Sequence, residues 1–530
     1  MVTFSPKSYL RRWWIGLLAL GLGFGTPVPA AAGPPDENEY YRLISIATSQ
    51  APTDSRSKTW KPAPAELALE VSGLSVLDAH RIAVAIRKGE VWILDGACED
   101  PPSQVTYRRF ASGLHEPLGL LWHDNAFYTA QRSELTRLRD TDGDGEADEY
   151  ETVATGWGVT GHYHEYAYGP KRDGQGNLWL TLNIGLGLKA EHLQRAVREP
   201  TLGVSQGKWR GWALKMTPAG KLIPVCAGMR SPCGLGSNRA GDMFYTDQQG
   251  NWVATNSLHH LREGVFFHHP EALASMNLPG SPIKGIRSVP DELPLPEALE
   301  RLPAMRPPAV WFPYKKAGQS ATDIVLDSSG GRFGPFDGQL FVGEFTLAAI
   351  HRVFLEQVDG EYQGACFPFR QGLASAVLRL AQAPDGSLLA GLSNRGWSSL
   401  GTASYGLQRL AWTGKTPFEI QEMRAQSDGF ELVFTEPVDP ITAANVRSYT
   451  MHSYTYVFHE TYGSDEIQSQ QLTISRAEVA DDARRVRLFV SGLRPYFVHE
   501  LLAAGVRNEQ GAPLLHASAY YTLNRIPLKY

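Results

Sequence analysis

Three polar segments of the sequence carry residue types that acid–base chemistry needs. GHYHEYAYGP contains His162 and His164, RSPCGL begins with Arg230, and the segment from Lys315 to Gln319 adds a cation and an amide. A neutral histidine can take the proton of an alcohol, while an arginine stabilises the negative charge that develops. Together these groups suit oxidation or hydrolysis. For each histidine, the alternative is a structural role beside a strand.

The segment DTDGDGEADEYE, residues 140–151, indicates a metal site. Its spacing matches the D-x-D-x-D-G-x5-E pattern of a calcium loop, in which Gly145 permits a sharp turn. The predicted ligands are Asp140, Asp142, Asp144, the carbonyl of Glu146, Asp148 and Glu151. Because the flanking segments have the composition of strands, we expect a structural calcium ion in a hairpin rather than an EF-hand. An acidic, solvated turn is the alternative.

A repeated pattern predicts the elements that position these residues. GLHEPLGLLWHDNAFYT begins at Gly113, and the similar GMRSPCGLGSNRAGDMFYT begins at Gly228. A turn followed by an apolar strand that ends on a polar residue recurs along the chain. The copies are EVWILD (90–95), AFYTAQ (126–131), NLWLTLN (177–183), DMFYTD (242–247), QLFVGE (339–344) and SLLAGLSN (387–394). One such unit cannot bury both its faces alone, so we expect the units to stack.

The predicted fold is all-β: a six-bladed β-propeller followed by a C-terminal immunoglobulin-like β-sandwich. We expect the propeller over residues 61–413, after a linker and first-strand region at 33–60, and the accessory sandwich over 414–530. An irregular pair of sandwiches is the alternative for the repeats. The loops that lead into the inner strands of a propeller meet at one mouth of its channel, so the polar segments are expected there.

The N-terminal residues predict export. Three basic residues precede the apolar run from Trp13 to Gly25, and small residues follow it, so residues 1–32 have the order of a signal peptide. We therefore expect a periplasmic or extracellular protein, with association to the membrane through an uncleaved signal as the alternative. The net charge of −5 argues against a nucleic acid as partner.

The cysteines do not form a disulfide framework in a chain of this length. Cys226 and Cys233 are close enough in sequence to close one small loop, and buried free thiols are the alternative. The chain has no C-x-x-C-H motif, so it cannot attach haem covalently. If the protein transfers electrons, the acceptor must lie on another chain, such as a cytochrome c.

The segments around Arg230 resemble a known family. RSPCGL, followed by TDQQGN at 246–251, resembles signatures of the quinoprotein glucose/sorbosone dehydrogenase propellers, which use pyrroloquinoline quinone (PQQ). Almost all of the chain after residue 32 is similar to the propeller module of secreted bacterial proteins of the membrane-bound dehydrogenase, haem-binding type. The similar phrases include FASGLHEPLGL, YTDQQGNW, FGPFDGQLFVGEF and LQRLAWTGKTPFEI. The resemblance implies an oxidoreductase that acts on a sugar or related alcohol.

The resemblance also implies roles for single residues. Arg230 and Gln249 would contact PQQ, and the carbonyls of Gly250 and Asn251 would be calcium ligands. His162 or His164 would be the base, and Lys315 and Gln319 complete the expected cofactor pocket. The chain departs from the family at Ser231, where the family has asparagine, and at Arg379, which is displaced from the family's arginine pair.

Three functions are therefore in competition. The first is an exported, calcium-containing oxidoreductase with PQQ at the channel mouth. The second is a non-catalytic propeller that binds carbohydrate or a protein partner. The third is a hydrolase or lactonase, for which the metal-binding side chains would be Glu116, Asn183, Asp247 and Glu344.

Overall fold

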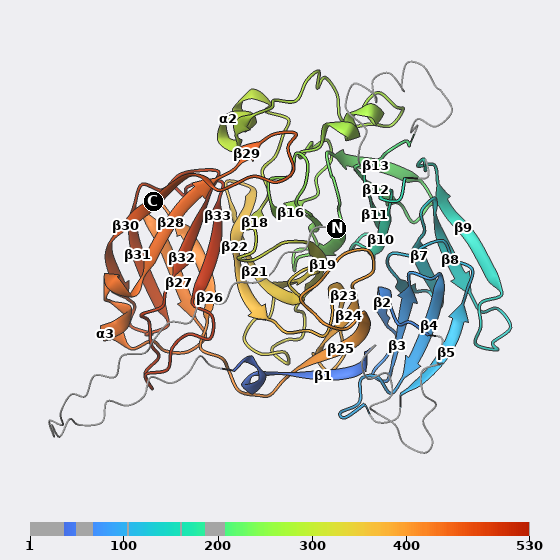
Figure 1. Ribbon diagram of the computed structural model, residues 1–530, viewed down its shortest axis with the longest axis horizontal. Coiled ribbons are helices and arrows are strands. Elements are labelled where there is room, and N and C mark those ends of the chain that lie inside the picture. The colour runs from blue at the N-terminus through green and yellow to red at the C-terminus, as the bar shows by residue number, and fades with distance from the viewer. Residues whose placement is uncertain (1–35, 49–66, 103–104, 160–161, 186–206, 529–530) are drawn as a thin grey trace, which may run out of the picture. The chain divides into compact units, whose positions relative to one another are not determined.

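A computed structural model describes residues 36–48, 67–102, 105–159, 162–185 and 207–528. The predicted signal peptide, residues 1–32, lies outside these ranges. The chain from Asp36 onward forms one compact unit, in which antiparallel meanders are arranged as a β-propeller (Figure 1). Within the described ranges, no helix is long and apolar enough to cross a membrane.

Five blades are separate four-stranded sheets. The first two comprise β2 (Val71–Val76), β3 (Arg81–Ile86), β4 (Glu90–Asp95) and β5 (Thr106–Ala111), then β6 (Leu121–His123), β7 (Ala126–Ala130), β8 (Glu134–Arg139) and β9 (Glu149–Thr155). The next two comprise β10 (Ala167–Arg172), β11 (Leu178–Leu182), β12 (Trp212–Met216) and β13 (Leu222–Ala227), then β14 (Gly234–Ser237), β15 (Met243–Asp247), β16 (Asn256–His260) and β18 (Val310–Phe312). The last combines β23 (Val377–Gln382), β24 (Leu388–Ser393) and β25 (Tyr405–Trp412) with β1 (Tyr41–Thr48).

The predicted count of six separate blades is wrong. The remaining meander comprises β19 (Ala321–Leu326), β20 (Leu340–Glu344), β21 (Ala349–Val358) and β22 (Glu361–Arg370). These strands belong to an eleven-stranded sheet, because the outer edge of β22 pairs with β33 (Ser518–Leu523) near the C-terminus. The structure thus has five blades as separate sheets, and this meander continues into the C-terminal region.

The C-terminal strands form the rest of that sheet. They are β26 (Ile420–Gln426), β27 (Gly429–Phe434), β28 (Thr450–Thr455), β30 (Ile467–Val479), β31 (Arg485–Ser491), β32 (Phe497–Leu502) and β33. In the described ranges they do not make a sheet separate from the propeller strands, and the immunoglobulin-like plan of residues 414–530 stays a prediction. The short elements are η1 (Glu37–Glu39), η2 (Pro270–Ser275), β17 (Leu293–Pro294), α2 (Leu295–Arg301), α3 (Pro440–Ala443), η3 (Val446–Ser448) and β29 (Val457–Phe458).

Five of the six predicted copies of the repeat fall on the second strand of their meander: β7, β11, β15, β20 and β24. The first copy, EVWILD, is instead the third strand of its blade, β4. The second strand there is β3, RIAVAI, which ends on the apolar Ile86. The sequence pattern selected β4 because β4 ends on Asp95, as the other copies end on polar residues.

The glycines of the repeat lie where the first strands of neighbouring meanders come closest. A Cβ atom on Gly119 would lie 2.3 Å from the carbonyl oxygen of Gly169, and one on Gly234 would lie 2.0 Å from that of Thr322. Because no side chain fits at such distances, both positions require glycine. The first strands contact one another in the order β2, β6, β10, β14, β19, β23 and back to β2. Their ends therefore share one opening.

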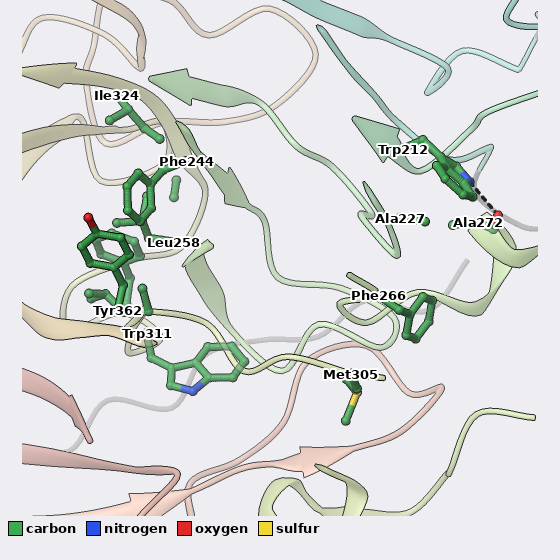
Figure 2. Packing of buried hydrophobic residues seen from close by; sticks show 14 of the residues in the cluster. Trp212, Ala227, Phe244, Leu258, Phe266, Ala272, Met305, Trp311, Ile324 and Tyr362 are labelled. Carbon is green, nitrogen blue, oxygen red and sulfur yellow. Dashed lines mark hydrogen bonds between the residues drawn. The ribbon is translucent and has the colours of Figure 1, made fainter. Parts of the chain in front are cut away.

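The meanders and the C-terminal strands share apolar cores. Phe244 of β15 packs edge-on against Tyr362 of β22, with ring centroids 5.1 Å apart (Figure 2). Trp212 of β12 is fully buried, and its indole N–H donates to the carbonyl of Ala272 at 2.7 Å. A second cluster packs Phe367 of β22 with Tyr521 of β33. Burial of these side chains holds the blades and the C-terminal strands against each other.

Candidate functional site

A cavity of about 400 Å³ opens at one end of the propeller. Most of its lining comes from loops of two kinds: those that lead into first strands and those that join second to third strands. Both kinds lie at the same end because successive strands of a meander are antiparallel. The lining side chains from the first kind include Tyr163, His164, Arg230, Tyr314 and Gln319, and those from the second include Arg87, Gln248, Gln249, Thr346, Arg395 and Trp397.

His164 is buried in the wall of this cavity. Its Nδ1 lies 3.3 Å from the carbonyl oxygen of Ile184, and its Nε2 lies 3.3 Å from Oγ of Ser231. With the proton on Nδ1, the ring donates to the carbonyl of Ile184 and Nε2 accepts from the hydroxyl of Ser231, whereas the amide nitrogen of Asn183, also 3.3 Å from Nδ1, suits the other tautomer. Burial, and then the positive charge of Arg230, lower the pKa of His164 to about 3. The imidazole is therefore neutral at pH 7.

Arg230 is the buried cation of the cavity. Its Nη1 donates to Oγ of Ser231 at 3.1 Å, but its Nε has no hydrogen-bond partner among the described residues. The side chain is 5% exposed, and burial lowers its pKa. A buried guanidinium is costly by itself, so the site favours a ligand that supplies acceptor oxygens to the part of Arg230 that lines the cavity; the Nε is itself buried against Gly250.

Asp247 fixes the backbone at Arg230 and Ser231 by hydrogen bonds. Its carboxylate accepts hydrogen bonds from the backbone N–H of Arg230 at 2.9 Å and of Ser231 at 2.7 Å. Burial raises the pKa of Asp247 to about 6. The carboxylate thus fixes the RSPCGL turn from below and leaves the guanidinium free to face the cavity.

The cavity wall is cationic. Its lining includes Arg87, Arg230 and Arg395, and none of the described lining residues is acidic. Arg87 shares Glu116 with Arg132, at 2.5 Å for each pair, so this cluster keeps one positive charge. Arg395 is neutralised by Glu70 at 2.6 Å, whereas Arg230 forms no ion pair with a described side chain, so the wall keeps an excess of positive charge. An anionic ligand is therefore favoured electrostatically.

The predicted partners of His164 and Arg230 are divided between the cavity and its surroundings. Gln249 and Gln319 line the cavity, whereas His162 and Lys315 do not. The Nδ1 of His162 accepts a hydrogen bond from the backbone N–H of His164 at 3.2 Å, so His162 supports the loop. Of the two candidate bases, the geometry therefore favours His164.

The two residues expected to bind calcium next to Gln249 have other contacts. The carbonyl of Gly250 accepts hydrogen bonds from the N–H groups of Val253 at 3.1 Å and Gly463 at 3.0 Å. The side chain of Asn251 donates to the carbonyl of Glu460 at 2.8 Å. Both lone pairs of the Gly250 oxygen are thus used, and this segment is bound to the C-terminal region.

The acidic segment 140–151 comprises the loop from β8 to β9 and the first residues of β9, as the strand-like flanks predicted. Carboxylate oxygens of Asp140, Asp142 and Asp144 lie within 4.8 Å of one another. Among the described residues, this is the one place where three or more acidic, histidine or cysteine side chains come close enough to hold a metal ion. The carboxylate of Asp148 instead accepts from the N–H of Thr141 at 3.0 Å, and Glu151 pairs with Arg137. Three of the six predicted ligands are therefore gathered here. The Glu146 N–H donates to Asp144 at 2.8 Å.

The proposed hydrolase set is not gathered around the cavity. Glu116 is bound by two arginines, Asp247 accepts backbone N–H groups, and Glu344 accepts the N–H of Gln319 at 2.7 Å. The amide nitrogen of Asn183 lies 3.3 Å from His164. None of these four described residues lines the cavity, and the carboxylates form no group that could hold a metal ion.

Sequence reasoning missed several residues of the cavity. Arg87, Arg395 and Trp397 lie in loops between second and third strands, whereas the prediction from loop position covered only loops before first strands; Gln249, in a loop of the other kind, was named by the family resemblance. The segment NRGW at 394–397 was a signal, since it is polar and follows a copy of the repeat. Tyr462 comes from the C-terminal region, and no local pattern connects it to the propeller.

The buried thiols play no visible part in linking the chain. Cys98, Cys226, Cys233 and Cys366 are all free, so of the two alternatives for Cys226 and Cys233 the structure shows buried free thiols and not a small disulfide loop. Cys233 lies in the cavity wall, where Nη1 of Arg379 is 3.7 Å from its sulfur. Arg379 donates to the carbonyls of Ser72 and Leu118, and thus ties first-strand segments together below the cavity.

The fold and the site define a β-propeller with a cationic pocket at one end of its axis. The chain belongs to the family described as a domain of unknown function, DUF7133, which matches residues 93–365. No curated protein matches the chain.

The chain is similar to several solved structures. A glucose dehydrogenase-type oxidoreductase of Thermus thermophilus is 17% identical, with a TM-score of 0.46 over 70% of this chain and 99% of that chain. The soluble aldose sugar dehydrogenase of Escherichia coli is 11% identical, with a TM-score of 0.46 over 70% and 99%. A PQQ-bound aldose sugar dehydrogenase of Streptomyces coelicolor is 14% identical, with a TM-score of 0.44 over 72% and 100%. The likeness is one of fold.

Proposed function

We propose that the chain is an exported quinoprotein-type oxidoreductase that removes two electrons and two protons from a sugar or related alcohol. The proposal includes PQQ in the cavity, a structural calcium ion at Asp140, Asp142 and Asp144, and a cytochrome c on another chain as acceptor. The observation that carries it is the presence, in one cavity, of a neutral imidazole at His164 and a guanidinium at Arg230 that forms no ion pair with a described side chain.

The residues of the cavity suit a flat, anionic quinone. Arg230 lines the cavity, and the described lining contains cations and amides but no carboxylate. Arg230 and Gln319 would hold such a group by donating to its oxygens. When bound, the quinone supplies the acceptor for the hydride that leaves the alcohol carbon.

The protein's own residues would then control the proton. In the tautomer with the proton on Nδ1, Nε2 of His164 accepts from the hydroxyl of Ser231 and would take the hydroxyl proton of the substrate through that hydroxyl or after displacing it. The pKa of His164 is low because of burial and the charge of Arg230. An anion placed on Arg230 offsets that charge and raises the basicity of His164. Ligand binding would thus activate the base.

The test uses the mature chain with PQQ and Ca²⁺. We expect the absorption of PQQ to change on binding, and a sugar from a broad panel to reduce an artificial dye. His164→Gln should lower kcat at least about 100-fold because it removes the base, while PQQ binding is retained. His452→Gln, at an exposed histidine of β28, is the matched control. If PQQ does not bind, or no sugar reduces the dye, the proposal fails.

A non-catalytic propeller that binds carbohydrate is the second candidate. The observation in its favour is that exposed aromatic side chains surround the cavity, as at many sugar-binding sites. Sugar binding without any reduction of the dye, in the presence of bound PQQ, would favour this candidate over the oxidoreductase.

A further inference from the structure

Exposed aromatic side chains are concentrated around the cavity. In the described part of the chain, five tyrosine and tryptophan residues are exposed, and four of them line this cavity. They are Tyr163, Tyr314, Trp397 and Tyr462, whereas Tyr150 lies on β9 outside it. Large apolar rings are rarely left exposed together without a ligand or partner to cover them.

Tyr462 differs from the other three because it belongs to the C-terminal region. It lies in the loop between β29 and β30, more than two hundred residues after Arg230 in the sequence. The guanidinium carbon of Arg230 lies 5.3 Å from the centroid of the Tyr462 ring. This distance is within the range of a cation–π contact, so the ring forms a wall over the cation.

The position of Tyr462 is fixed by the backbone around it. The N–H of Trp252 donates to the carbonyl of His459 at 3.0 Å, and the N–H of Ser464 donates to the carbonyl of Ala254 at 2.9 Å. Gly463 donates to the carbonyl of Gly250 at 3.0 Å. These bonds attach the loop to the segment after Gln249 on both sides of Tyr462, so the ring stays at the mouth although it is 61% exposed.

Space at the adjacent glycine shows how closely this loop fits. Gly463 has φ +66°, and a Cβ atom there would lie 2.7 Å from the amide nitrogen of Gln249. A larger residue would strain the backbone at this positive φ and would displace the side chain of Gln249. The chain therefore has a glycine where the loop must approach the propeller most closely.

From this arrangement we propose that Tyr462 is a specificity-determining residue, which stacks on a hexopyranose ring at the mouth of the cavity. The flat CH face of a pyranose suits the phenol ring, and its hydroxyl groups suit the amides and hydroxyls of the lining. Trp397 and Tyr163, which come from other loops, lie at the edge of the same cavity. The C-terminal region thus contributes directly to the binding site. The stacking of a sugar on Tyr462 does not require the proposed function to be correct. Only the oxidation of the bound sugar rests on that function.

The experiment measures binding without turnover. The full chain without quinone is titrated calorimetrically with D-glucose, D-glucuronate and cellobiose, so that neutral, anionic and longer ligands are compared. We expect Tyr462→Ala to weaken the binding of the sugar that binds best by about tenfold, and Tyr462→Phe to retain it within about threefold, since the ring and not the hydroxyl makes the contact. Tyr150→Ala, at the exposed tyrosine outside the cavity, should bind as the unchanged chain does.

Two results would overturn the inference. One is that the unchanged chain binds none of the three sugars. The other is that Tyr462→Ala, with an unchanged melting temperature, binds them as tightly as the unchanged chain. Failure of the proposed function has a different signature: sugar binding that depends on Tyr462, with no dye reduction when PQQ is added.

Discussion

Gly250 offers the sharpest test of the anion site, because it controls where the Arg230 side chain can lie. A Cβ atom on Gly250 would lie 1.9 Å from Nε and 2.0 Å from Cζ of Arg230. Ordinary contacts require more than about 3.4 Å, so Gly250→Ala must displace the guanidinium by about 1.4 Å or more. The φ angle of Gly250 is outside the left-handed region, so alanine does not strain the backbone.

The displacement should affect binding much more than folding. The side chain of Arg230 makes one hydrogen bond, to Ser231, whose loss costs about 1 kcal/mol. A hydrogen bond from a charged donor to a ligand contributes about 1.5–3 kcal/mol, which corresponds to roughly 10- to 150-fold in affinity. We therefore expect Gly250→Ala to weaken PQQ binding by this factor, close to the effect of Arg230→Ala, and to keep most of its stability.

The assay is titration of the quinone-free chain with PQQ, followed by tryptophan fluorescence, together with thermal unfolding. Gly174→Ala is the matched control, because a Cβ atom there meets no other atom within 4 Å. Wild-type affinity in Gly250→Ala, with no binding in Arg230→Ala, would refute the crowding between Gly250 and the guanidinium. Wild-type affinity in both would refute Arg230 as the anion-binding residue.

Three further predictions concern charge and metal binding. Arg230→Gln should raise the pKa of His164, since the charge of Arg230 helps to lower that pKa. The measurement is the titration of the His164 imidazole NMR signals against pH, and the same titration midpoint in the variant and the unchanged chain would contradict the prediction. Although burial opposes it, Glu419 and Glu37 raise the pKa of His516 to about 9, which is above the unfolded value of 6.5. The interaction of protonated His516 with the two glutamates therefore stabilises the fold fully below pH 6.5. This contribution, of the order of 3 kcal/mol, is lost as pH rises through 9. Urea unfolding of His516→Gln should show a smaller fall in stability between pH 6 and 9.5, and an unchanged fall would disprove it. Ca²⁺ should raise the melting temperature of the unchanged chain but not of Asp142→Asn, and equal responses would exclude calcium at this loop.

The sequence predicted the propeller because its repeat has local causes. Gly119 and Gly234 recur since neighbouring first strands approach too closely for any side chain, and that requirement is visible as a pattern. The assignment of EVWILD failed for an equally local reason. Strands β3 and β4 are both apolar and short, and only hydrogen bonding between strands distinguishes the second from the third.

The candidate site was predictable where it depends on the repeat. His164 and Arg230 each precede a first strand, and the structure places both in the cavity. Tyr462 could not be predicted, because its place depends on backbone hydrogen bonds between residues more than two hundred positions apart. The prediction of a calcium ligand at the Gly250 carbonyl has the same weakness. That carbonyl accepts a hydrogen bond from the N–H of Gly463, which comes from the same distant loop and could not be foreseen from the local sequence.

The pairing of β22 with β33 has a consequence for how this chain can be divided. β33 covers backbone donors and acceptors at Gly364, Ala365 and Cys366 on the outer edge of β22, a ten-residue strand whose side chains are mostly buried. A version truncated after Trp412 would leave these groups open to water and to the same groups on another molecule, which is the geometry of intermolecular sheet growth. By covering this edge, the residues after Trp412 also protect the propeller from aggregation. Recombinant forms that omit these residues should precipitate.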